Sequence, residues 1–162
     1  MFVIFKIVKV IFFIPKILFA EGGDKYTNDP DDSGGETKYG ISKRSFPNLD
    51  IKNLTEAQAI AIYKKIYCDP CKIDLINDEF LALHVFDFAV TSGVHKSITT
   101  LQKVVGVEDD GIVGKDTLKA VNTGNHVEAF KNARIAFYTQ IGVGKNAKYK
   151  KGWINRVNNL EL

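Results

Sequence analysis

Cysteine is scarce in this chain: Cys68 and Cys71 are the only two among 162 residues, and they form the motif CDPC. Two cysteines exclude a small scaffold held together by several disulfides. A structural zinc site needs about four ligands, and the three histidines do not supply the rest at a ligand-like spacing. A redox motif usually begins a helix after a strand, whereas this one follows a helical segment. We therefore interpret both cysteines as plain thiols or an incidental bridge.

Long uncharged apolar runs are also absent. Lys6, Lys9 and Lys16 interrupt the N-terminal segment MFVIFKIVKVIFFIPKILFA, and the longest uncharged stretch inside it covers residues 10–15. That stretch is too short for a membrane-spanning helix of about 20 residues. The lysines share one face of a helical wheel, which favours an amphipathic structural helix over an export signal or membrane anchor. Transient membrane association through residues 1–20 stays open, and we expect a monomer.

Acidic residues are missing from the C-terminal stretch. Residues 131–160 carry seven basic residues and no acidic one, whereas residues 21–36 carry six acidic residues and one lysine. A basic flank suits an anionic partner such as nucleic acid, acidic lipid or cell-wall polymer, and a solvated helix face is the alternative. We expect no nucleic-acid partner, because the stretch has only Tyr149 and Trp153 as nearby aromatics and contains no recognised module.

The first third of the chain predicts a helix, a turn-rich loop and a small hairpin. Two glycines at positions 22 and 23 end an apolar helix over residues 3–21. The segment ETKYGIS predicts a short hairpin around Gly40. Thr55 and Gln58 then form a capping box, which predicts a helix over residues 55–67.

The rest of the chain is helical by its apolar periodicity. Two helices end at Gly93 and Gly106, and the loop VEDDGIVG follows. Three further helical segments are KDTLKAV, HVEAFKNARIAFYTQI and GWINRV. The sequence therefore predicts a mainly α fold.

Glu21 occupies the last turn of the first predicted helix, beside apolar residues 17–19. The helix dipole presents partial negative charge there, and apolar surroundings penalise a carboxylate, so both effects favour the protonated carboxyl group. A positioned carboxylic acid is what cleavage of a glycosidic bond requires, because the leaving sugar oxygen must gain a proton. A solvent-exposed glutamate at a helix end is the alternative.

The loop after Glu21 offers a second catalytic group. Asp29, Asp31 and Asp32 are candidates to activate water or to stabilise an oxocarbenium ion, and Thr37 offers a hydroxyl that could position water. The same loop can be aligned with a calcium-binding loop, but its last position would be Gly40 rather than the bidentate glutamate. We expect no metal.

The segment EGGDKYTNDPDDSGGETKYGIS resembles the signature E-G-G…N-D-P-x-D-x-G-G-x-T-x-x-G-I-[ST] of the lysozyme-like glycoside hydrolase family 108, whose members include phage endolysins. The similarity continues through HVFDFAVTSG into LQKVVGVEDDGIVGKDTLKAV, which looks like the family's peptidoglycan-binding part, and closes with KGWINRVNNL. One departure is Tyr67-Cys68, because family members commonly carry a tryptophan after the tyrosine. The resemblance implies a lysozyme-like fold with a small β-hairpin beside the active-site cleft, and it places the general acid at Glu21.

Five further residues are candidates for substrate binding. Asp87, Thr91 and Ser92 recur at helical spacing and could line a cleft opposite the glutamate; a buried helical aspartate with a local partner is the alternative for Asp87. Tyr39 and Trp153 are candidates for stacking on sugar rings, with core packing as the alternative for each.

These observations predict a lysozyme-like catalytic region over residues 1–93 and a helical peptidoglycan-binding region over residues 94–162, packed as one globule. The expected activity is an N-acetylmuramidase that cleaves the β-1,4 bond between N-acetylmuramic acid and N-acetylglucosamine without a cofactor. The alternatives are a lytic transglycosylase and a non-catalytic wall-binding module. We expect peptidoglycan as the partner, at the bacterial wall or in the periplasm, after export or release from the cytoplasm.

Overall fold

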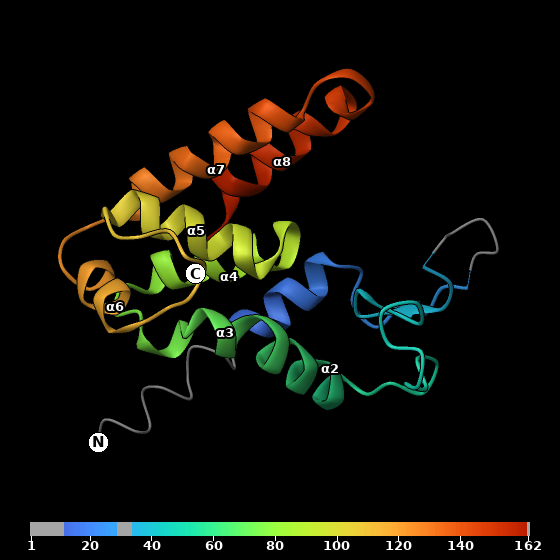
Figure 1. Cartoon of the computed structure of the whole chain (residues 1–162). Coiled ribbons are helices and arrows are strands. Elements are labelled where there is room, and N and C mark those ends of the chain that lie inside the picture. The colour runs from blue at the N-terminus through green and yellow to red at the C-terminus, as the bar shows by residue number, and fades with distance from the viewer. Residues whose placement is uncertain (1–11, 29–33, 162) are drawn as a thin grey trace. The chain divides into compact units, whose positions relative to one another are not determined.

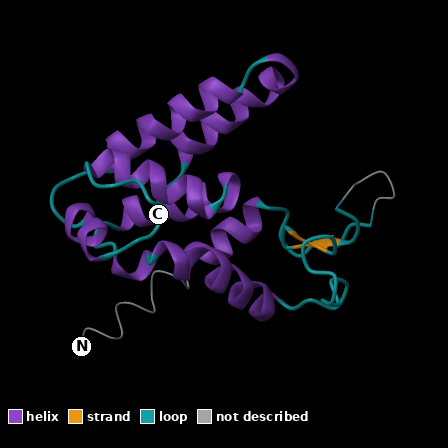
Figure 2. Cartoon of the chain, in the orientation of Figure 1, coloured by secondary structure: helices purple, strands orange, loops and turns teal. Residues whose placement is uncertain are grey.

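The computed structural model describes residues 12–28 and 34–161, and the chain divides into two compact units, Met1–Ile66 and Tyr67–Leu162. Helices make up most of the described chain, and the strands form one small hairpin (Figure 1, Figure 2). The predicted mainly α fold is therefore confirmed. Two parts of the predictions lie outside the described residues: the start of the first helix, residues 3–11, and the loop at residues 29–33.

The first described helix covers residues 12–20 and is amphipathic. Its buried residues recur at helical spacing: Phe13, Ile14, Ile17 and Leu18. The helix ends where the sequence predicts, because the next glycines have φ values of 107° and 59°, which few other residues adopt. Within the described ranges, none of the helices combines the length and the apolar content that crossing a bilayer requires.

The hairpin consists of β1 (Thr37–Lys38) and β2 (Ile41–Ser42), which pair antiparallel. Its two turn residues, Tyr39 and Gly40, have φ values of 54° and 70°. Positive φ at both central residues is the requirement of a type I′ turn, which fits the twist of the flanking strands. An isolated bridge between Thr27 and Thr37 adds the preceding segment to the edge of β1.

The capping box at the start of α2 (Glu56–Tyr63) is formed as predicted. The Gln58 N–H donates to Thr55 Oγ1, and the Thr55 N–H donates to Gln58 Oε1 at 2.9 Å. Beyond Tyr63 the chain continues as a π-helical turn, Lys64–Cys68, and not as the regular α-helix expected to residue 67.

The C-terminal unit is a helical assembly around α4 (Glu79–Ser92). All residues from 81 to 89 are buried, as expected for a helix covered on every side. Helices α5 and α7 pack against α4, and α8 runs beside α7 (Figure 1). The other elements of this unit are α3 (Asp69–Cys71), η2 (Ile73–Leu75), α5 (Val94–Val105), α6 (Lys115–Val121), α7 (Val127–Ile141), η3 (Gly144–Asn146) and α8 (Ala147–Asn159).

The loop between α5 and α6 is organised by the buried side chain of Gln102. Its Nε2 donates to Asp110 Oδ1 and to the Ile112 carbonyl, and its Oε1 accepts from the Gly111 N–H. A β-carbon at Gly111 would lie 2.3 Å from His95 Nδ1, so no larger residue fits there without rearrangement.

Candidate active site

Glu21 directly follows the helix over residues 12–20 and continues its hydrogen bonding. Its N–H donates to the Ile17 carbonyl at 2.9 Å, and the Gly23 N–H donates to the Leu18 carbonyl at 2.9 Å. This pattern closes the helix and turns the chain away immediately after Glu21. The side chain is half-buried, and its Oε1 atom is shielded from solvent.

The hairpin turn lies against this helix end. A β-carbon at Gly40 would lie 2.9 Å from Glu21 Cβ and 2.7 Å from the Tyr63 hydroxyl. The Tyr63 hydroxyl donates to the Tyr39 carbonyl at 3.1 Å, and the Tyr39 N–H donates to the Gly23 carbonyl at 3.0 Å. Three separate segments, the helix end, the hairpin and α2, therefore converge on Glu21, with glycine at the closest approach.

An open pocket of about 440 Å³ adjoins this junction. Its lining residues are Pro15, Leu18, Phe19, Gly22, Gly23, Asp24, Tyr39 and Glu56. The pocket combines an aromatic ring that is 83% exposed, Phe19, with a tyrosine and two carboxylates. Apolar rings with a few polar groups are the usual lining of a small-molecule site and suit the two-sided surface of a sugar. Glu21 is not itself a lining residue, but Gly22 and Gly23, which follow it in the chain, and Tyr39, the neighbour of Gly40, are.

Tyr39 lies in the pocket wall with two carboxylates, Asp24 and Glu56. Partial burial raises the pKa of its phenol, and the charges of Asp24 and Glu56 raise it further. The phenol therefore stays neutral at physiological pH and keeps a hydroxyl for hydrogen bonding. The structure thus places this predicted stacking residue beside the candidate acid.

Sequence reasoning missed Asp24 and Glu56 as site residues. Asp24 could have been found, because it follows the E-G-G motif directly. Glu56 carried no such signal: it is the first residue of α2, next to its capping threonine, and lies 35 positions after Glu21 in the chain.

The predicted second catalytic group is only partly described. Thr37 lies in β1, where its hydroxyl donates to the Gly35 carbonyl at 3.2 Å. Asp29, Asp31 and Asp32 lie outside the described residues, so their predicted role stays a prediction. In the part of the chain that the structure describes, no three His, Cys, Asp or Glu side chains gather as metal ligands would.

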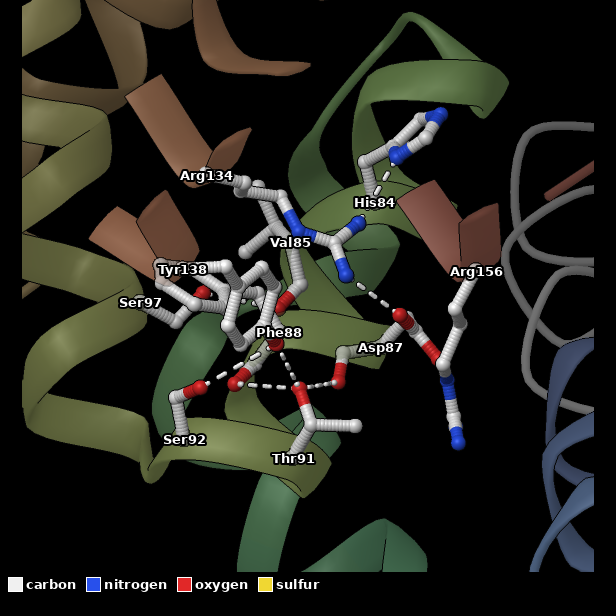
Figure 3. A network of polar contacts seen from close by, with 10 residues as sticks. All are labelled: His84, Val85, Asp87, Phe88, Thr91, Ser92, Ser97, Arg134, Tyr138 and Arg156. Carbon is white, nitrogen blue, oxygen red and sulfur yellow. Dashed lines mark hydrogen bonds and ion pairs between the residues drawn. The ribbon is translucent and has the colours of Figure 1, made fainter. Parts of the chain in front are cut away.

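Three of the remaining predicted substrate residues, Asp87, Thr91 and Ser92, belong to a polar network in the C-terminal unit (Figure 3). Asp87 is fully buried; its Oδ2 accepts from Arg134 and its Oδ1 accepts from Arg156 at 2.8 and 2.9 Å. Its side chain therefore faces protein partners and not an open cleft. Asp87 is thus a buried helical aspartate, which was the alternative interpretation. Its partners, however, come from α7 and α8 and not from residues close to it in the sequence.

Thr91 and Ser92 bind another protein hydroxyl in the same network. Tyr138 Oη lies 2.8 Å from Thr91 Oγ1 and 3.2 Å from Ser92 Oγ (Figure 3). Trp153 lies beside the same tyrosine, with ring centroids 5.5 Å apart, and beside Tyr149 at 5.8 Å. The structure thus brings Thr91, Ser92 and Trp153 together around Tyr138.

His84 and the cysteines are structural. Arg134 Nη1 donates to His84 Nδ1 at 2.8 Å, and burial, followed by the arginine charge, lowers the pKa of His84 to about 4. Cys68 and Cys71 are buried, and burial raises the pKa of the Cys71 thiol to about 12. A thiol with so high a pKa is a poor nucleophile and metal ligand, which agrees with the interpretation as plain thiols.

The helical architecture and the small hairpin beside a helix-end glutamate are those of a lysozyme-like fold. Residues 14–93 match the family model described as Glycosyl hydrolase 108, and residues 96–158 match the one described as Predicted Peptidoglycan domain. The chain belongs to the glycosyl hydrolase 108 family.

A solved structure supports this assignment. The structure of Brucella abortus SagA is similar with a TM-score of 0.76 and 31% sequence identity, and the match covers 92% of this chain and 89% of that chain. No curated protein sequence matches the chain. The family and the second domain together make the chain a lysozyme-like hydrolase whose partner is peptidoglycan, and this partner places its action at the cell wall.

Proposed function

We propose that this protein is an N-acetylmuramidase that cleaves the β-1,4 bond between N-acetylmuramic acid and N-acetylglucosamine, with Glu21 as the general acid. The observation that carries the proposal is the junction of Glu21 with the Tyr39–Gly40 turn at the edge of the aromatic pocket. This arrangement holds a carboxyl group beside a surface suited to sugar rings. Family membership supports the reaction class.

The proposed reaction uses Glu21 to protonate the oxygen of the leaving N-acetylglucosamine as the bond to the muramic acid anomeric carbon breaks. The resulting oxocarbenium ion needs a nearby negative charge, and the attacking water must lose a proton. Asp29, Asp31 and Asp32 remain our candidates for these tasks, with Thr37 as a water-positioning group. To them we add Asp24 and Glu56, because these carboxylates line the pocket.

Other expectations from the sequence remain proposals of the same kind. We propose a monomer that reaches the wall by export or release, with transient membrane association through residues 1–20. We also retain the division into a catalytic region over residues 1–93 and a wall-binding region over residues 94–162.

The variant Glu21→Gln tests the acid assignment. The amide keeps the size of the side chain but cannot donate the required proton, so we expect wall lysis to fall by about 10²- to 10⁴-fold. Glu108→Gln is the matched control, because Glu108 is exposed in the loop between α5 and α6. Most of the activity surviving in a folded Glu21→Gln protein would refute the assignment.

Mass analysis of the new sugar ends tests the bond and the outcome. Reducing N-acetylmuramic acid ends support the proposed hydrolysis. Ring-closed ends lighter by one water would identify a lytic transglycosylase, and reducing N-acetylglucosamine ends would mean that the other bond is cut. Binding without any new ends would leave a wall-binding module.

A further inference from the structure

Four aromatic rings in the C-terminal unit form a row from the core to the surface. We call Phe88, Tyr138, Trp153 and Tyr149 the aromatic row. Ring centroids lie 5.8 Å apart between Phe88 and Tyr138, 5.5 Å between Tyr138 and Trp153, and 5.8 Å between Trp153 and Tyr149. The exposed fraction rises from 0% at Phe88 and 3% at Tyr138 to 49% at Tyr149. Tyr149 is therefore the ring that the row presents to solvent, whereas Trp153 has two ring neighbours within the protein.

The exposed end of the row is held in place from the inside. The Tyr138 hydroxyl is bound to the hydroxyls of Thr91 and Ser92, which fixes α7 to α4 at this point (Figure 3). Trp153 packs on Tyr138, and Tyr149 packs on Trp153 from the preceding turn of α8. A ring that is already ordered loses little conformational entropy when a ligand covers it. The contacts along the aromatic row thus hold the Tyr149 ring in a fixed position before any ligand binds.

Tyr149 lies in a helix that is rich in basic residues. Helix α8 carries Lys148, Lys150, Lys151 and Arg156 and no acidic residue. Arg156 is engaged by Asp87, whereas no carboxylate among the described residues forms an ion pair with any of the three lysines. Lys148 Nζ lies 4.9 Å from the centre of the Tyr149 ring. The surface therefore offers an exposed aromatic ring with an ammonium group lying over it.

Peptidoglycan has the chemistry that matches this pair. The C–H face of a pyranose ring is apolar and packs on an aromatic ring, and tyrosine combines a flat apolar body with a polar tip. The carboxylates of the stem peptide, or the lactyl carboxylate of a muramic acid that carries no peptide, are partners for an ammonium group. An uncharged polysaccharide would use the ring alone.

We infer that Tyr149 is the sugar-stacking contact of the peptidoglycan-binding domain, with Lys148 binding a carboxylate of the same ligand. The inference rests on the proposed function, because it assumes that the chain binds the wall through this domain. The stacking role expected of Trp153 is thereby assigned to Tyr149, and Trp153 instead stacks on Tyr149 from within the protein.

Sedimentation with purified peptidoglycan tests the inference in the full-length chain carrying Glu21→Gln, so that the polymer is not degraded. Tyr149→Ala should weaken binding about tenfold, which corresponds to about 1.4 kcal/mol, and Tyr149→Phe should bind nearly as the parent does. Phe80→Ala is the matched control, since Phe80 is a ring in the same unit that is 46% exposed and lies outside the row. Lys148→Gln should weaken binding to peptidoglycan but not to uncharged chitooligosaccharides.

The single tryptophan provides a readout that a purely structural role would not move. Trp153 lies next to Tyr149, so titration with soluble peptidoglycan fragments should change its fluorescence saturably. Unchanged binding by a folded Tyr149→Ala protein would overturn the inference while leaving wall binding intact. So would binding that leaves the fluorescence of Trp153 unaltered. Failure of the parent protein to sediment would instead overturn the proposed wall binding, and this inference with it.

Discussion

Gly40 is the residue on which the geometry around Glu21 depends most directly. It combines a φ of 70° with a close approach to the glutamate and to the Tyr63 hydroxyl. Gly35 has nearly the same φ, 67°, but a β-carbon there would meet only Lys43 Cβ, at 4.0 Å. The two glycines therefore separate the cost of backbone strain from the cost of displacing Glu21.

Replacing each glycine with alanine should give different results. Gly35→Ala should cost about 1–2 kcal/mol of unfolding free energy, the price of a β-carbon in left-handed backbone, and leave catalysis nearly unchanged. Gly40→Ala should cost about 1–3 kcal/mol more, because the added atom overlaps its neighbours, and should also lower kcat by moving Glu21, the proposed acid. Denaturant unfolding and wall-lysis rates measure both effects. Equal losses of activity in the two variants would contradict the placement of Gly40 against Glu21.

His84 makes the stability of the C-terminal unit sensitive to acid. Its pKa is about 4 in the folded protein and 6.5 in an unstructured chain. Between pH 6.5 and 4 His84 is mostly protonated in the unfolded state but mostly neutral in the folded state. The free energy of unfolding therefore falls as the pH drops from about 6.5 to 4. The total loss from this group is at most about 3 kcal/mol.

Urea unfolding across this pH range checks the prediction. His84→Gln should lower stability at pH 7, where the neutral ring accepts from Arg134, but should flatten the decline between pH 6.5 and 4. His95→Gln is the control, because His95 is exposed on α5. A pH profile as steep in His84→Gln as in the parent protein would show that other groups cause the acid sensitivity.

At the scale of elements, the first turn of α2 affects both the stability of this helix and the position of a residue that lines the pocket. Its capping box fixes the first turn, which contains the pocket residue Glu56. Thr55→Ala should cost about 1 kcal/mol, the usual value of a lost N-cap, and should raise KM more than it lowers kcat if Glu56 contacts substrate. Thr139→Ala, at an exposed position within α7, should change stability by less than about 0.5 kcal/mol. Thermal unfolding and substrate titration distinguish the two; an unchanged melting temperature in Thr55→Ala would contradict the prediction.

Element boundaries were predictable where a local signal marks them. The positive φ values of the glycines at 22, 23, 93 and 106 end their helices as the sequence predicts, and the capping box begins α2. The start of α8 was missed: the sequence suggested Gly152, but the helix begins at Ala147 and contains this glycine in its interior. A glycine inside a helix costs only about 1 kcal/mol, which the packing of α8 along α7 outweighs.

The candidate site was predictable only where residues close in sequence form it. Glu21 and Tyr39 belong to one continuous motif, so sequence could place both. The partners of Asp87 are 47 and 69 positions away, and only tertiary packing brings Arg134 and Arg156 to it. Helical spacing alone could not show that this aspartate would be buried rather than exposed in a cleft.

For the whole molecule, the distribution of charge matters more than its sum. Of the basic residues between 131 and 160, Arg134 and Arg156 are bound to Asp87, and Lys131 pairs with Glu128. The lysines that remain lie together in η3 and α8: Lys145, Lys148, Lys150 and Lys151. Their charges are therefore available for an anionic polymer, although the net charge of the chain is only +3.

Replacing these four lysines with glutamine should weaken sedimentation with cell walls at low salt and flatten its salt dependence. In the parent protein, raising the ionic strength toward molar should weaken binding, because the Debye length falls to about 3 Å at 1 M. The control replaces Lys52, Lys64, Lys65 and Lys72, which are exposed and lie outside residues 94–162, and so removes the same charge elsewhere. Cleavage of a short uncharged oligosaccharide, where the enzyme accepts one, should change little in either variant, since steering charges act on encounter and not on the bond that breaks. The same salt profile in both quadruple variants would mean that only the net charge matters and that the four lysines of η3 and α8 form a solvated face. Wall binding would then depend on the aromatic row and on the remaining surface of the peptidoglycan-binding domain.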